Sequence, residues 1–140
     1  MNSISKLIPH SGDMILIDRI LNCDAHTLTA ELIVRGDGFI CGDAKTVPSW
    51  IGIEYMAQTI AAYAGTVARQ ANIGFLLGTR RYNCNVSTFD VGTKLTISAQ
   101  KIMQDGNLAA FECRILGANV EVTANLNVYQ PTSNEHTEKP

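Results

Sequence analysis

The chain has 140 residues, of which 46% are hydrophobic, and this is enough for one domain with a sizeable core. The formal net charge of -2, with no block of like charges, argues against a nucleic-acid-binding surface, which needs a basic stripe. The first residues lack the pattern of a signal peptide, and no stretch is apolar enough to span a membrane. We therefore expect a cytoplasmic protein.

Four cysteines, Cys23, Cys41, Cys84 and Cys113, are widely spaced and form no CxxC pair. This spacing is unlike that of a zinc site, so no metal is expected. An even number of cysteines permits disulfides. Cys113, however, lies among alternating strand residues, where a buried free thiol is the more common arrangement. We expect reduced cysteines.

The first third of the chain predicts a β-hairpin followed by a loop. Residues 14–20 are apolar and β-branched and predict a strand, residues 22–26 predict a turn, and residues 27–34 predict a second strand. Glycines at 36 and 38 end this hairpin, and residues 39–47 are expected to form a loop.

The longest run with helical character covers residues 50–70 and is apolar on almost every face. A helix of this kind belongs inside a protein. Pro48 precedes it, and Ser49 is a suitable N-cap residue. Glu54 places a carboxylate close to the start of this buried helix, so its side chain must be paired, be hydrogen-bonded or have a raised pKa.

Four strands are expected after the helix, at residues 75–85, 93–103, 108–116 and 120–128. The last three alternate apolar and polar residues, with the period of a half-buried strand. Short turns join them, so they should be antiparallel neighbours. Their sheet would have one apolar face that can curl around a single helix, and a second subunit is the economical cover for the rest of that helix.

This order of elements resembles the hot-dog fold, an α+β fold in which a curved antiparallel sheet wraps around one long central helix. Three segments resemble the 3-hydroxyacyl-[acyl carrier protein] dehydratases of fatty-acid synthesis. They are Leu-Ile-Pro-His at 7–10 with Asp-Arg at 18–19, Pro-Ser-Trp-Ile-Gly-Ile-Glu-Tyr-Met-Ala-Gln at 48–58, and Asp-Val-Gly-Thr-Lys-Leu at 90–95. The residues of the second segment are most similar to those of the aryl-polyene-type dehydratases. We expect one domain over residues 1–129 and a polar, disordered tail over 130–140.

The resemblance implies dehydration of a 3-hydroxyacyl thioester on an acyl carrier protein to a trans-2-enoyl thioester, without cofactor or metal. Glu54 matches the family's catalytic glutamate and would act as the acid at the leaving hydroxyl, with its pKa raised by an apolar acyl tunnel. The alternative is a buried glutamate that only pairs with Gln58, one helical turn later; in the catalytic interpretation, Gln58 orients Glu54. Backbone N–H groups near Ser49 and Trp50, at the helix N-terminus, would hold the thioester oxygen.

One departure from the family concerns its histidine, which lies in the loop before the helix. Here the loop at residues 39–48 contains no histidine, and Asp43 occupies roughly that place. His10 is the histidine in a segment that matches the family, so we hypothesise that it works with Glu54. A structural or entrance role for His10 is the alternative, and Asp43 is a second candidate for the base.

The resemblance also implies partners. Hot-dog subunits join edge to edge with their sites between two helices, so we expect a homodimer or a heterodimer with a related subunit. Two other interpretations stay open: a non-catalytic subunit that completes the site of its partner, and an acyl thioesterase. Arg80 and Arg81 would serve the acidic face or phosphopantetheine arm of a carrier protein. As adjacent strand residues they should point to opposite faces, so only one would do so.

Overall fold

The computed structural model describes residues 16–36, 45–68 and 75–129. In chain order the elements are strands β1 (Arg19–Cys23), β2 (Thr27–Ile33) and β3 (Thr46–Pro48), the 3-10 helix η2 (Ser49–Ile51), the helix α2 (Gly52–Ala68), and strands β4 (Phe75–Cys84), β5 (Thr88–Asp90), β6 (Lys94–Asp105), β7 (Leu108–Gly117) and β8 (Val120–Tyr129). Neither described helix is long and apolar enough to cross a membrane.

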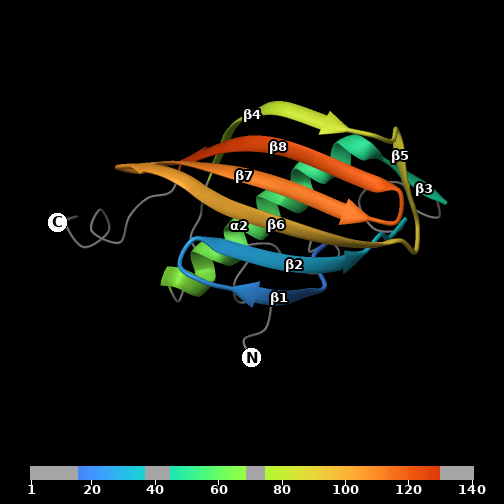
Figure 1. Cartoon of the computed structure of the whole chain (residues 1–140), viewed down its shortest axis with the longest axis horizontal. Coiled ribbons are helices and arrows are strands. Elements are labelled where there is room, and N and C mark those ends of the chain that lie inside the picture. Colours follow the sequence, from blue (N-terminus) through green and yellow to red (C-terminus); the bar gives the residue numbers. More distant parts are fainter. Residues whose placement is uncertain (1–15, 37–44, 69–74, 130–140) are drawn as a thin grey trace.

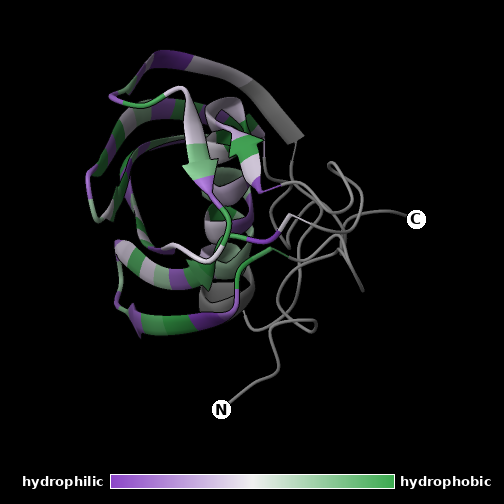
Figure 2. Ribbon diagram, turned by 90° about the vertical axis from the view of Figure 1, so that its right-hand side faces the viewer, coloured by the Kyte–Doolittle hydropathy of each residue, from purple (hydrophilic) through white to green (hydrophobic). Residues whose placement is uncertain are grey.

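Six strands form one antiparallel sheet in the order β1-β2-β6-β7-β8-β4. The sheet curves around α2, which lies along its inner face (Figures 1 and 2). The helix contacts β2, β6 and β7 in the middle of the sheet. This architecture confirms the predicted α+β fold with one central helix.

The alternation in β7 and β8 decides which face of the sheet meets the helix. In β7, Phe111, Cys113 and Ile115 are buried, while Glu112 and Arg114 between them are exposed. Residues 122, 124, 126 and 128 of β8 are buried in the same way. The period of two therefore predicted the inner face correctly, because side chains of a strand point alternately to its two faces.

The predicted turns between the last strands are present. Gly106 adopts a φ of 61° in the turn from β6 to β7, where Asp105 pairs with Leu108. Asn119 adopts a φ of 62° between β7 and β8. Glycine and asparagine tolerate this left-handed backbone, which matches the twist of paired strands. These tight turns make β6, β7 and β8 sequential neighbours.

The strand predicted for residues 14–20 was wrong in its limits: residues 14 and 15 lie outside the described part of the chain, and residues 16–18 are not in a strand. β1 starts at Arg19 and continues through Cys23, and the turn is confined to residues 24–26. Asp24 tightens it, because its Oδ1 accepts hydrogen bonds from the N–H groups of His26 and Thr27 at 2.9 Å. Leu16 and Ile17 are buried without belonging to a strand. These two residues are apolar because they pack in the core, and they do not pair in the sheet.

A second small sheet was not predicted. Strand β3 pairs antiparallel with β5 through Val47 and Phe89, which are both fully buried. Three-residue strands give too short a pattern to detect in sequence. This sheet helps to position the start of the helix, because β3 leads directly into it.

The thiol of Cys113 provides a test of the core. Cys23, Cys84 and Cys113 are free cysteines, and Cys113 is buried. Burial raises the pKa of the Cys113 thiol to about 12, with a smaller contribution from Glu112. We expect iodoacetamide at pH 8 to modify Cys23 and Cys84 in the native protein and Cys113 only after unfolding, as measured by peptide mass spectrometry. Modification of Cys113 at the rate of Cys23 would contradict this packing.

Candidate functional site

The start of the central helix is held by contacts from two distant parts of the chain. The N–H of Ser49 donates to the Ser87 carbonyl at 3.0 Å, and the Ser49 carbonyl accepts from the Tyr82 hydroxyl at 2.6 Å. Pro48 is the N-cap residue, in extended conformation, and makes no side-chain cap. The prediction of Ser49 as the N-cap was therefore wrong, because the chain enters the helix through a 3-10 turn that already includes Ser49.

At Gly52 the backbone of the helix lies close to Tyr82 of β4 and Ile115 of β7. A Cβ at this position would overlap the Tyr82 hydroxyl oxygen and would lie 3.2 Å from Cδ1 of Ile115. Only a residue without a side chain fits there while Tyr82 keeps its hydrogen bond to Ser49. Burial raises the pKa of Tyr82, so its hydroxyl remains a proton donor. The Tyr82 contact thus fixes the helix two residues before Glu54.

Glu54 is in the first turn of α2 and is half-buried. Nε2 of Gln58 donates a hydrogen bond to Oε2 of Glu54 at 3.0 Å, the contact that their spacing predicted. Gln58 is itself 1% exposed, and its Oε1 accepts the N–H of Leu16 at 2.8 Å. This second bond assigns the amide orientation, since the oxygen faces a donor and the nitrogen faces the carboxyl group.

The helix is not buried on every face, which agrees with the expectation that the sheet covers only part of it. Half-buried residues follow one another at helical spacing along one stripe: Ile53, Glu54, Ala57 and Ala61. The other described helix side chains beyond Gly52 are buried, Tyr55 and Met56 among them. Glu54 therefore lies on the one side of the helix that the sheet does not cover.

Two tyrosines fix the helix within the sheet. The ring of Tyr55 stacks on Phe89 of β5 with centroids 6.1 Å apart, and burial raises the pKa of Tyr55 to about 12 despite the charge of Arg35 nearby. About two helical turns further on, the Tyr63 hydroxyl donates to the Ala25 carbonyl at 2.6 Å. Both hydroxyls remain protonated at neutral pH, so these residues support the site without titrating.

Some of the predicted site residues lie together at the start of the helix, and others fall outside the described residues. The 3-10 helix η2 contains Ser49 and Trp50, and the first two turns of α2 contain Glu54 and Gln58. Trp50 is 62% exposed. His10 and Asp43 fall outside the described residues. In the described ranges, no three His, Cys, Asp or Glu side chains are grouped as metal ligands. The sequence did not single out Tyr82, because its approach to Ser49 depends on a bulge in β4.

Gln58 makes a prediction possible for the stability of the site. In Gln58→Met, the buried Leu16 N–H loses its acceptor and Glu54 loses a donor. We expect the free energy of unfolding to fall by about 1–3 kcal/mol, the cost of an unsatisfied buried group. Urea denaturation measures it. Gln100→Met, at an exposed position of β6, is the matched control and should change stability by less than about 0.5 kcal/mol. Equal effects of the two variants would contradict the role given to Gln58.

The chain matches the family model of the ApeP-like proteins, described as ApeP dehydratase, over residues 2–139. It is similar to a chain of the dehydratase heterocomplex ApeI:P from Xenorhabdus doucetiae, with 30% identity over 99% of this chain and 97% of that one and a TM-score of 0.82. No curated protein matched it.

More distant structures share the fold alone. A hypothetical thioesterase from Streptococcus pneumoniae, solved with coenzyme A, is 10% identical over 80% of this chain and 86% of that one, with a TM-score of 0.60. The PaaI protein of E. coli is 12% identical over 83% and 80%, also with a TM-score of 0.60. With the family model covering nearly the whole chain and the heterocomplex as a near-complete structural match, this chain belongs to the ApeP-like dehydratase family.

Proposed function

We propose that this dehydratase removes water from a 3-hydroxyacyl thioester carried by an acyl carrier protein and leaves a trans-2-enoyl thioester for aryl-polyene biosynthesis. The observation that carries the proposal is the carboxyl group of Glu54. It lies on the uncovered stripe of an otherwise buried helix, and a buried amide fixes its orientation. Structural glutamates need no such placement, whereas an acid that meets substrate does.

The reaction needs an acid at the C3 hydroxyl, a base for a C2 proton and donors for the thioester carbonyl. We assign the acid to Glu54. Gln58 already donates to Oε2, so a protonated Glu54 carries its proton on Oε1. Proton transfer from Oε1 lets the C3 hydroxyl leave as water. Gln58 acts as a positioning residue, because it touches the carboxyl group and is buried behind it.

The thioester oxygen is assigned to the start of the helix. The first N–H groups of a helix lack intrahelical acceptors and carry partial positive charge. The Ser49 N–H is engaged with Ser87. We therefore assign the N–H of Trp50, the other member of the predicted pair, to the thioester oxygen. The C2 base stays with His10 or, as the second candidate, Asp43.

A related hot-dog subunit is the proposed partner. The similar Xenorhabdus protein is part of a dehydratase heterocomplex. In this chain the stripe of Ile53, Ala57 and Ala61 beside Glu54 is only half-buried, and a packed neighbour would remove it from water. A partner there would also enclose the acyl chain next to the carboxyl group, which strengthens electrostatic contacts in the site.

One assay separates the proposed activity from its alternatives. The purified chain, alone and mixed with a related hot-dog subunit, is given a 3-hydroxyacyl carrier protein, and products are identified by mass spectrometry. An enoyl thioester, 18 Da lighter than the substrate, is the expected product. Release of free carrier thiol would identify a thioesterase instead. Activity that returns only on mixing, and survives loss of Glu54 and His10 in this chain, would identify a non-catalytic subunit.

A further inference from the structure

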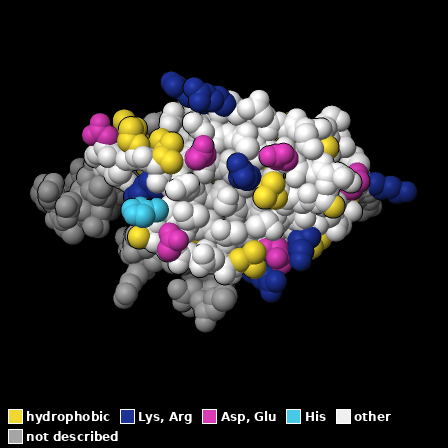
Figure 3. Space-filling view, in the orientation of Figure 1, with side chains coloured by type: hydrophobic (Ala, Val, Ile, Leu, Met, Phe, Trp, Pro, Cys, Tyr) yellow, Lys and Arg dark blue, Asp and Glu magenta, His cyan; other side chains and the backbone are white. Residues whose placement is uncertain are grey.

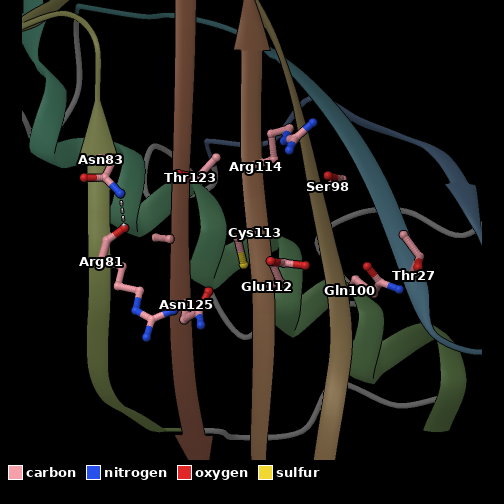
Figure 4. A pocket seen from close by; sticks show the side chains of 11 residues that line it. Thr27, Arg81, Asn83, Ser98, Gln100, Glu112, Cys113, Arg114, Thr123 and Asn125 are labelled. Atoms are coloured by element: carbon pink, nitrogen blue, oxygen red, sulfur yellow. Dashed lines mark hydrogen bonds between the residues drawn. The ribbon is translucent and has the colours of Figure 1, made fainter.

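A groove crosses the outer face of the sheet, on the side opposite α2. It has a volume of about 450 Å³ and extends from β2 to β4. Figure 3 shows this face, where charged and scattered apolar side chains stand among neutral polar ones. The groove is lined mainly by polar side chains, including Arg81, Asn83, Glu112, Arg114, Thr123 and Asn125 (Figure 4). None of them belongs to the site around Glu54, which lies across the sheet.

A bulge in β4 brings Arg81 to this groove. Arg80 pairs with Asn125 and Asn83 pairs with Thr123, so Arg81 and Tyr82 together face a single residue of β8. Tyr82 turns inward to Ser49, and Arg81 lines the groove on the outer face. Arg80 is on the outer face as well, because it pairs with Asn125, which also lines the groove. The expectation that adjacent arginines occupy opposite faces was therefore wrong, because a β-bulge adds one residue and re-aims the side chains around it.

The backbone of Arg81 is unfavourable for an arginine. Its φ of 56° lies in the left-handed region, which glycine adopts freely and residues with a Cβ adopt only at a cost. The side chain of Asn83 supports this conformation by donating from Nδ2 to the Arg81 carbonyl at 3.1 Å. Glycine would suit the bulge better. Strain of this kind is typical of functional positions, where the side chain and not the backbone is needed.

The guanidinium group of Arg81 is not paired with a carboxylate of the described chain. The ion pairs found among the described residues all involve Glu31 of β2, which binds Arg19 of β1 and Lys94 of β6. These strands are separated from β4, the strand of Arg81, by β7 and β8. In Figure 4 the Arg81 side chain extends toward Asn125. A planar guanidinium presents donors that match the two oxygens of a carboxylate or phosphate.

We propose that this groove binds a small polar anion, with a phosphate or carboxylate group held by the guanidinium of Arg81. Asn125 adds an amide next to that position, and farther along the groove Thr123 adds a hydroxyl and Arg114 a second positive charge (Figure 4). Glu112, in the middle of the groove, accepts hydrogen bonds only, so the rest of the ligand carries hydroxyl or amide donors. A phosphorylated or carboxylated metabolite with such donors is the ligand class.

The test uses inorganic phosphate and, in a second arm, acetate as probes for the two anionic groups. Amide chemical shifts of the full chain are followed by NMR at constant ionic strength, maintained with chloride. We expect saturable shifts centred on Arg81, Arg114 and Asn125, with millimolar affinity. The anion with the tighter binding identifies the group that the ligand carries. Shifts that do not saturate in either arm, or that are equally large at Arg19 and Lys94, would overturn the proposal.

Arg81→Gly separates binding from structure. It relieves the left-handed backbone, so we expect the Tm to rise by about 2–4 °C while the affinity for the anion falls at least tenfold. Arg80→Gly removes the same charge one residue away, outside the groove, and should bind like the unaltered chain. Arg81→Asn, which tolerates this φ, should lose binding as Arg81→Gly does. Binding by Arg81→Gly at the original affinity, or equal losses in Arg80→Gly, would overturn the assignment.

Discussion

Glu54→Gln is expected to lower dehydratase turnover by about 10²–10⁴-fold, the usual contribution of a general acid. Glutamine has the same shape as glutamate, and its oxygen can still accept the hydrogen bond from Nε2 of Gln58. The variant therefore loses the transferable proton without losing the contact that orients the side chain. Turnover is measured as enoyl thioester formed from a 3-hydroxyacyl carrier protein, with the preparation that is active in the mixing assay.

Glu121→Gln is the matched control for this variant. Glu121 is an exposed carboxylate of β8, on the outer face of the sheet, and its replacement should leave turnover unchanged within about twofold. Thermal unfolding of Glu54→Gln should remain within a few degrees of that of the unaltered chain, because the hydrogen bond is retained. A Glu54→Gln chain with unchanged turnover would show that the acid is elsewhere and that Glu54 only pairs with Gln58.

The parts of this fold that sequence predicts are those with local periodicity. Alternation in residues 108–116 and 120–128 identified the inner face of β7 and β8, and the turns between them followed from glycine and asparagine. The long apolar run identified α2. That the sheet leaves one side of the helix uncovered was expected, but the residues on that side were not predicted, because they depend on how far the sheet extends around the helix, which composition does not record.

The parts that sequence misses depend on distant contacts. Gln58 binds the Leu16 N–H across 42 residues, and no local pattern announces that pairing. Tyr82 reaches Ser49 only because a bulge at Arg81 shifts the alternation of β4. The motif around Glu54 was recognisable from its residue types, but the contacts that hold its helix in place come from β4 and from Ser87, the residue just before β5. The family motif was thus easier to recognise in the sequence than the contacts that hold it in place.

Gly52→Ala is expected to be the most disruptive small substitution near the site. The added methyl group overlaps the Tyr82 hydroxyl and crowds Cδ1 of Ile115, so either the hydrogen bond to Ser49 breaks or the helix start moves. We expect stability to fall by about 1–3 kcal/mol, as for other overpacked sites. Turnover should fall as well, by up to about 10²-fold, because a displacement of about 1 Å misaligns a catalytic group.

The cause can be isolated by combining Gly52→Ala with Tyr82→Phe. Tyr82→Phe alone removes the hydrogen bond to the Ser49 carbonyl and should cost about 0.5–1.5 kcal/mol. It also removes the oxygen that the new methyl group meets. The double variant should therefore cost at least about 1 kcal/mol less than the sum of the single variants, since residues in direct contact are coupled. Urea unfolding at one fixed protein concentration measures all four chains.

Gly78→Ala provides the reference for a glycine without this constraint. A Cβ at Gly78 meets no atom within 4 Å, although it lies on the same strand as Tyr82. Its replacement should change stability by less than about 0.5 kcal/mol, and it should show no coupling to Tyr82→Phe. Additive costs for Gly52→Ala and Tyr82→Phe would mean that the methyl group is accommodated elsewhere. The position of Glu54 would then depend on Gln58 and the small β3–β5 sheet rather than on the Tyr82 contact.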